Sequence, residues 1–187
     1  MRIIAGTCRG RPILPPVGET TRPITDRVKQ SLFDIVFDRI DGSVVYDLFA
    51  GTGSMGLECL SRGARNVLFI ESDPSAVELL RKNLHNLGLA RGARVVSRDV
   101  FSWLAGAPGP DAANRAALVF LDPPYRMIQE NPAALATCAA TLADRHLAAD
   151  GIVIFRHHRA DALALVPLAV YDERHYGAMT LTFLKKA

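Results

Sequence analysis

The chain has 187 residues, of which 49% are hydrophobic and 22% charged, and its formal net charge is +3. This composition is typical of one soluble globular domain, with or without a small appendage. No apolar run approaches the roughly 18 residues needed to span a bilayer, and the first residues lack the apolar segment of a signal peptide. We therefore expect a cytoplasmic protein with no membrane partner.

The basic residues are concentrated near the N-terminus. Residues 1–31 hold six basic and two acidic residues, whereas the remainder holds 16 basic and 17 acidic ones. A basic segment on a nearly neutral body favours a polyanionic partner, although a merely soluble N-terminus is the alternative. We take residues 1–24 as an arm or hairpin and 25–187 as the main domain. The candidate nucleic-acid contacts are Arg9, Arg11, Arg22 and Arg27.

The apolar pattern alternates between short runs and helical stretches. In chain order it predicts a helix over 24–40, a strand over 43–49, a helix over 54–63, a strand over 66–71, a helix over 73–89, a strand over 93–97, a short helix over 100–106, a loop over 106–115, a strand over 116–122, a helix over 132–147, a strand over 151–157, a short helix over 159–165, and two strands within 168–186.

This order of elements predicts an α/β fold of the doubly wound, Rossmann-like type. Strands that alternate with helices form a mostly parallel sheet covered on both faces. The two consecutive strands near the C-terminus, joined near Tyr176 and Gly177, break the alternation. We expect them to form an antiparallel edge of that sheet.

Cysteine and histidine offer few candidates for chemistry. Cys8, Cys59 and Cys138 are far apart and form no C-x-x-C, so neither a disulfide framework nor a metal site is expected. We interpret all three as small packing residues. His157 and His158 follow the fifth strand, and we interpret them as surface histidines.

A glycine-rich turn follows the first strand of the sheet. Gly51, Gly53 and Gly56 have the spacing G-x-G-x-x-G and open a helix, as in dinucleotide-binding folds. The spacing alone is weak evidence. Asp47 precedes the turn, where its carboxylate would repel a pyrophosphate but suit a cationic amino-acid group.

Two further acids follow the next two strands. Glu71 can accept hydrogen bonds from both hydroxyls of a ribose, and Asp99 from the exocyclic amine of an adenine. The carboxyl ends of parallel strands meet at the edge of the sheet where ligands bind. A ligand with ribose, adenine and an α-amino group is S-adenosylmethionine. We add the neighbouring residues Phe49, Ser72 and Val100 to the candidate cofactor site.

The fourth strand ends in Asp122, Pro123, Pro124 and Tyr125. An exocyclic amine on a nucleobase is a poor nucleophile, so its methylation requires that the amine be held in line with the methyl sulfonium. The Asp122 carboxylate and the Pro123 carbonyl can accept its hydrogens, and the prolines fix φ so that these oxygens are preorganised. Tyr125 can stack on a flipped base. The alternative is an ordinary strand-ending turn.

These motifs resemble a known family. DLFAGTGSMGLE, IESD, SRDV and LDPPY, in that order, are similar to the motifs of class I methyltransferases that act on amino groups. The stretches RIIAGTCRGRPILPP and TRPITDRVKQSLFDIV resemble the RsmD family, and this resemblance spans about residues 1–125.

The resemblance implies a seven-stranded Rossmann-like sheet with an N-terminal hairpin. It implies methyl transfer from S-adenosylmethionine to the N2 amine of a guanine in bacterial 16S ribosomal RNA, naked or in an assembling small subunit. By this resemblance the cofactor positions are Asp47, Gly51, Gly53, Glu71 and Asp99, and the catalytic motif is Asp122, Pro123, Pro124 and Tyr125.

Three other functions remain open at this point. A DNA amino-methyltransferase would also contain the DPPY motif, but no separate DNA-reading segment is evident. An NAD-dependent oxidoreductase would use the glycine turn and Glu71, but would leave DPPY and Asp47 unexplained. A non-catalytic RNA-binding module would not need an intact DPPY.

Overall fold

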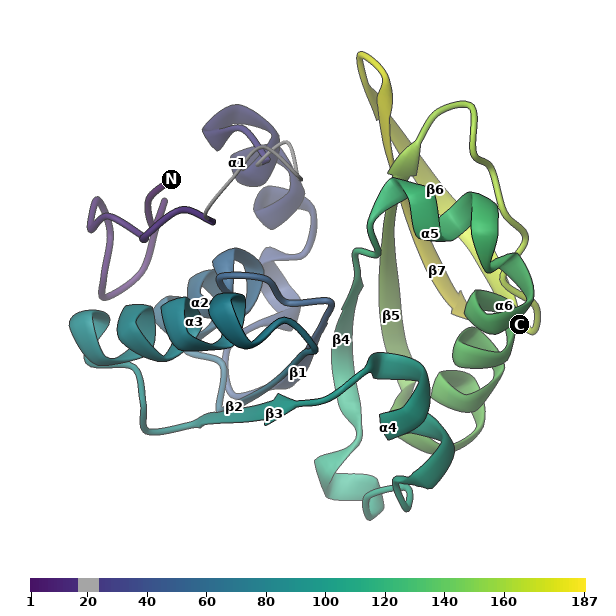
Figure 1. The fold of residues 1–187 in the computed structure, drawn as a ribbon, viewed down its shortest axis with the longest axis horizontal. Coiled ribbons are helices and arrows are strands. Elements are labelled where there is room, and N and C mark those ends of the chain that lie inside the picture. The colour runs from purple at the N-terminus through teal and green to yellow at the C-terminus, as the bar shows by residue number, and fades with distance from the viewer. Residues whose placement is uncertain (17–23) are drawn as a thin grey trace.

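The fold is a single mixed sheet between two layers of helices, as seen in a computed structural model that describes residues 1–16 and 24–187 (Figure 1). The elements are α1 (Asp26–Ile35), η1 (Phe37–Arg39), β1 (Val44–Leu48), α2 (Ser54–Ser61), β2 (Asn66–Glu71), α3 (Pro74–Leu87), β3 (Ala93–Ser97), α4 (Val100–Gly106), η2 (Ala112–Asn114), β4 (Ala116–Leu121), α5 (Tyr125–Glu130), α6 (Pro132–Thr141), η3 (Leu142–His146), β5 (Leu147–His158), β6 (Leu168–Tyr176) and β7 (Met179–Lys186).

The sheet has seven strands in the order β3-β2-β1-β4-β5-β7-β6. Strands β1 to β5 pair in parallel, whereas β7 is antiparallel to both β5 and β6. The predicted doubly wound sheet with an antiparallel C-terminal edge is therefore confirmed. None of the helices in the described part of the chain is long and apolar enough to span a membrane.

Alternating side chains of the central strands supply two separate cores. Val45, Phe69 and Phe120 face the layer that contains α1, α2 and α3. Tyr46, Ile70 and the other alternate residues face α4, α5 and α6. A period of two along strands that are covered on both faces is the expected pattern for a buried parallel sheet.

Several boundaries and elements differ from those predicted. Helix α1 ends at Ile35 and is followed by the short turn η1, rather than continuing to residue 40. Strand β5 begins at Leu147, so the helix predicted over 132–147 is shorter than expected. A short helix, α5, begins directly after the DPPY prolines, where no helix was predicted.

The helix predicted over 159–165 is wrong. Residues 160–165 have no regular helix, and Leu165 is buried while Leu163 packs against the same core. These two residues are two positions apart, which is the period of an extended segment rather than of a helix.

The N-terminal arm packs onto the main domain. Arg2 and Pro12 form an antiparallel bridge, and the Ile3 N–H donates to the Arg11 carbonyl at 2.9 Å. Ile3, Cys8 and Ile13 are buried in the same core as α1 and α2. The division of the chain at residue 24 stays a prediction.

A buried ionic cluster joins the arm, α1 and α2. Glu58 has no exposed side-chain surface, and its carboxylate lies 3.0 Å from the Lys29 Nζ and 2.9 Å from the Arg62 Nε. It also accepts from the backbone N–H groups of Ile4 at 2.8 Å and Ala5 at 2.9 Å. Burial raises the pKa of Glu58, but Lys29, the Ile4 N–H and Arg62 outweigh burial, so the pKa is lowered overall. The arm is therefore held by a charge that two cations and two amides compensate.

We predict that Glu58→Ala lowers the free energy of unfolding by about 3–5 kcal/mol, because it leaves Lys29 charged, buried and without its carboxylate. Chemical denaturation monitored by circular dichroism measures this change. Glu78→Ala is the matched control, since Glu78 also pairs with a lysine, Lys82, but on the surface of α3. It should leave stability essentially unchanged. Equal losses in the two variants would show that the cluster does not stabilise the fold.

Candidate active site

Three parallel strands bring the predicted acidic residues to one edge of the sheet. In β1, Leu48 is aligned with Ile70 of β2 and with Leu121 of β4. Glu71 and Asp122 come directly after these two partners. They therefore lie on either side of β1 at the same edge, which is the arrangement that the sequence predicted.

The glycine turn lies between β1 and α2 at this edge. Gly51 and Gly53 have φ angles of 55° and 85°, a region that L side chains rarely adopt. At Gly56 a Cβ would lie 2.2 Å from the Phe69 ring, so the start of α2 can pack directly on β2 only without a side chain there. The first and second glycines shape the turn, and the third allows the close packing of helix on strand.

Phe49 occupies a strained position just before the turn. Its φ of 60° is the only positive value for a non-glycine residue in residues 1–16 and 24–187. Such a conformation costs ~1–3 kcal/mol and persists only where the surroundings enforce it. The Phe49 ring contacts the ring of Phe101 at the start of α4, with centroids 5.8 Å apart. The two rings form the apolar part of the site.

Asp47 is buried at the end of β1, with 2% of its surface exposed. Its Oδ2 accepts from the Gly56 N–H at 2.8 Å, which ties the strand to the first turns of α2. Burial, together with the nearby Asp122 and Glu71 carboxylates, raises the pKa of Asp47 to about 8, although the Gly56 N–H and Lys29 oppose the change. Asp47 therefore braces the glycine turn, a structural role that the sequence did not indicate.

Glu71 is folded against the backbone of the glycine turn. Its Oε2 accepts from the Gly51 N–H at 2.7 Å, and its Oε1 accepts from the N–H groups of Ser72 at 2.7 Å and Asp73 at 2.8 Å. A carboxylate has about four lone-pair sites, so further donors such as ribose hydroxyls can still be accepted. Ser72 contributes its amide here, while its side chain is exposed.

Asp99 caps helix α4. Its Oδ1 accepts from the Ser102 N–H at 2.8 Å, the pattern of an N-cap residue. Val100 is 2% exposed and belongs to the core, so it packs beneath the surface of the site and does not line it. The half-buried Phe101 is the residue of this segment that can cover a ring.

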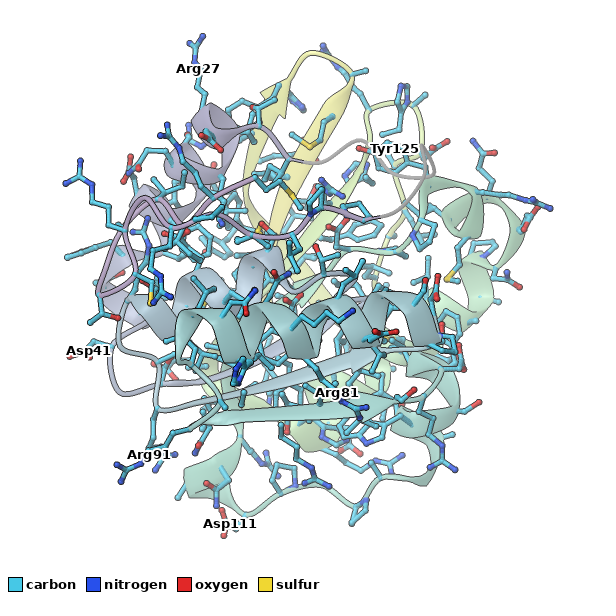
Figure 2. The ribbon with its side chains drawn as sticks, turned by 60° about the vertical axis from the view of Figure 1, so that its left-hand side comes forward. Arg27, Asp41, Arg81, Arg91, Asp111 and Tyr125 are labelled. Atoms are coloured by element: carbon cyan, nitrogen blue, oxygen red, sulfur yellow. The ribbon has the colours of Figure 1, made fainter. Side chains whose placement is uncertain are left out.

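The DPPY loop connects β4 to α5. Pro123 is buried, whereas Pro124 and Tyr125 are exposed, and Tyr125 is the first residue of α5. The Tyr125 ring, 36% exposed, meets the His158 ring edge to face with centroids 6.0 Å apart. Figure 2 shows Tyr125 at the end of the molecule opposite Asp111, which precedes β4. Tyr125 thus has an accessible ring next to Asp122.

Arg156 is the site residue that sequence reasoning missed. It lies near the end of β5, and its Nε donates to the Asp122 Oδ1 at 2.6 Å. Burial raises the pKa of Asp122, and Arg156 opposes that rise. The available signal was a single cation, Arg156, directly after the apolar run GIVIF, on the strand that follows the DPPY strand in the sequence.

The four arginines of the candidate RNA surface differ in their surroundings. Arg9 and Arg27 are exposed, and Figure 2 shows Arg27 projecting away from the body. Arg11 instead donates to the carbonyls of Leu87, at 2.9 Å, and Asn86 at the end of α3. Arg22 lies outside the described residues.

The histidine interpretation was wrong for His157, whereas all three cysteines are buried, as expected of packing residues. His157 is only 3% exposed, stacks on Phe155 and is hydrogen-bonded to Thr182 Oγ1 at 2.9 Å. Among the described residues, no group of three or more histidine, cysteine, aspartate or glutamate side chains could hold a metal ion.

Comparison with known proteins places this site in a family. The family described as "Conserved hypothetical protein 95" matches residues 1–185. "Putative rRNA methyltransferase YlbH" of Bacillus subtilis is 35% identical over 190 residues, which cover 100% of this chain and 99% of that protein. "Ribosomal RNA small subunit methyltransferase D" of Escherichia coli is 41% identical over 126 residues, 67% of this chain and 61% of that protein.

A solved structure of a protein similar in sequence has the same fold. "Putative methyltransferase yhhF from Escherichia coli" superposes with a TM-score of 0.82 at 33% identity, covering 100% of this chain and 97% of that chain. The family match over residues 1–185 and the full-length relative at 35% identity show that this chain belongs to the RsmD family.

Proposed function

We propose that this protein transfers a methyl group from S-adenosylmethionine to the N2 amine of a guanine in 16S ribosomal RNA, in the cytoplasm. One observation carries the proposal: the Asp122 carboxylate of DPPY and the Glu71 carboxylate beside the glycine turn lie at one sheet edge, on either side of β1. A methyl donor held at the turn is then adjacent to an amine held at DPPY. The names of the ribosomal RNA methyltransferases similar to this chain support the substrate class.

The residues around the glycine turn fit S-adenosylmethionine. Glu71 accepts the ribose hydroxyls beside the open Gly51 position, where a Cβ would have no atom of the described residues within 4 Å apart from its chain neighbours. Phe49 and Phe101 cover the adenine, and Asp99 accepts from its amine. When bound, this cofactor supplies the methyl group as an activated sulfonium.

The DPPY loop supplies the groups that act on the amine. The Asp122 carboxylate and the Pro123 carbonyl accept its two hydrogens, so that the nitrogen lone pair points toward the methyl group. As the nitrogen becomes positive, the carboxylate stabilises the developing charge. Tyr125 stacks on the base, and most of the rate enhancement comes from positioning.

The exposed arginines Arg9 and Arg27 are proposed to contact RNA phosphates, with the RNA naked or in an assembling small subunit. Such contacts give an affinity that falls steeply with salt. Arg11 is a weaker candidate, because its guanidinium already caps the end of α3.

The activity is tested by incubating the protein with labelled S-adenosylmethionine and small ribosomal subunits from cells that lack it. We expect label on a guanine N2, located by mass spectrometry of the digested RNA. Label on an adenine N6 or a cytosine N4 would refute the base, and no transfer to any nucleic acid would refute the activity. A thermal shift by S-adenosylmethionine but not by NAD would exclude the oxidoreductase.

We predict that Asp122→Ala lowers kcat/KM by at least about 10²-fold, because it removes an acceptor made for the reacting amine. The thermal shift caused by S-adenosylmethionine should remain. Asp150→Ala is the matched control, since Asp150 is an exposed acid near the opposite end of β5, and it should retain full turnover. Normal turnover in Asp122→Ala would contradict the role of this carboxylate.

We also predict that the affinity for S-adenosylhomocysteine rises with pH. In the free protein Asp47 is protonated below pH about 8. A cationic α-amino group nearby favours its ionised form, so binding releases a proton below that pH. The affinity should then rise by up to about tenfold per pH unit between about pH 6 and 8.

Isothermal titration calorimetry across this pH range measures the effect. Two controls isolate it: Asp47→Asn should remove the pH dependence, and 5′-methylthioadenosine, which lacks the amino acid group, should bind equally well at each pH. A flat profile for S-adenosylhomocysteine with the wild-type protein would rule out the contact with Asp47.

A further inference from the structure

Arg156 lies next to the catalytic motif because of the register between two strands. In the parallel pair β4–β5, Leu121 is aligned with Phe155, and the next residues are Asp122 and Arg156. Their side chains meet in a nearly buried contact, with 20% and 16% of the side-chain surface exposed and 2.6 Å between the Asp122 Oδ1 and the Arg156 Nε. Among the described residues, Arg156 is the only partner that donates a hydrogen bond to the Asp122 carboxylate.

Apart from Arg156, the ionisable groups around Asp122 are two acids, a tyrosine, a histidine and one lysine that acts on Asp47. Asp47 on β1 is close enough for its charge and that of Asp122 to interact, and Glu71 on β2 acts on the same Asp47. Tyr125 on α5 interacts with Arg156, and His158 follows on β5 with its ring against Tyr125. Lys29 on α1 acts on Asp47. Arg156 is therefore the cation that directly compensates Asp122.

We propose that Arg156 is a positioning residue that keeps Asp122 ionised and oriented, so that the second carboxylate oxygen faces the amine to be methylated. This inference rests on the proposed function for its role in turnover. Arginine is suited to the task because it stays protonated at every working pH and donates from a rigid plane.

The chemistry explains why ionisation of Asp122 matters. The amine lone pair forms the new N–C bond, while the C–S bond breaks and its electron pair stays on sulfur. The nitrogen becomes positive and then loses one proton to water. An anionic Asp122 stabilises that positive nitrogen, whereas a protonated one would turn an O–H toward the N–H groups and lose the attraction.

Burial opposes this ionisation. A carboxyl group at a desolvated site close to another carboxylate has a raised pKa, and an adjacent guanidinium lowers it by about one to three pH units. Removal of the guanidinium should shift the titration of Asp122 toward neutral pH. A purely structural contact would affect stability without moving that titration.

The first test uses the protein without cofactor or RNA. The carboxyl ¹³C signal of Asp122, assigned by its absence in Asp122→Asn, is titrated in the wild type, Arg156→Gln, Arg156→Lys and Arg159→Gln. We expect the midpoint to rise by about one to three pH units in Arg156→Gln and by less in Arg156→Lys. Arg159→Gln is the matched control, an exposed arginine three residues further on, and its midpoint should not move. An unchanged midpoint in Arg156→Gln would overturn the proposal.

The second test is the pH profile of methyl transfer. The acidic limb of kcat/KM for Arg156→Gln should shift upward with the Asp122 midpoint, so that activity lost at pH 6 returns at higher pH. A loss of equal size at every pH would show that Arg156 acts only on structure.

The two tests separate the inference from the proposed function. If the wild type transfers no methyl group to RNA, the proposed function fails, but the carboxyl titration still decides whether Arg156 keeps Asp122 ionised. If Arg156→Gln does not fold, Arg156→Lys is used instead, because it retains the charge with a different reach. The midpoint of the Asp122 titration in Arg156→Lys then decides whether the guanidinium is needed. A lysine midpoint equal to that of the wild type would show that charge alone suffices and would overturn a role in orientation.

Discussion

Crowding of carboxylates at one end of a parallel sheet is the constraint on which the rest of the site depends. Asp47, Glu71 and Asp122 lie close enough that the charges of the latter two raise the pKa of Asp47. Each acid has its own compensation. Asp47 has the Gly56 N–H, Glu71 has three backbone N–H groups, and Asp122 has a guanidinium. The glycine turn is therefore both a potential ligand site and a source of the amides that allow these acids to coexist.

The same helix that begins at this turn also anchors the N-terminal arm. Glu58 lies in the middle of α2 and binds Lys29 of α1 together with two amides of the arm. Lys29 in turn donates to Ser54 at the first position of α2, 3.3 Å away. The arm, α1 and the glycine turn thus share one network of charges and hydrogen bonds. A basic segment that looks like a loose tail in the sequence is an integral part of the core.

Most of the site could be predicted because its signals are local. The strand that ends in Asp122 and the glycines that open α2 are each specified within about ten residues, and parallel strands bring them together by rule. The partners of charged side chains could not be predicted in this way. Arg156, 34 residues after Asp122, and Glu58, more than 50 after the arm, are paired only by tertiary packing. The expected helix over 159–165 was wrong, because the spacing of Leu163 and Leu165 is that of an extended segment packed against the core.

The antiparallel strand β7 has a consequence for dissecting the molecule. It covers the outer side of β5, the strand that carries Arg156, along seven aligned pairs from Ile152 to His158. Every recognisable motif lies before residue 126, so a fragment chosen by its motifs alone would omit both β5 and β7. A longer fragment that ends at residue 161 would contain β5 but not β7. Its β5 would then be a long, apolar edge strand. Such an edge offers unpaired amides and carbonyls to other chains and promotes aggregation. The part of the chain that carries no motif therefore protects the edge of the strand that carries Arg156.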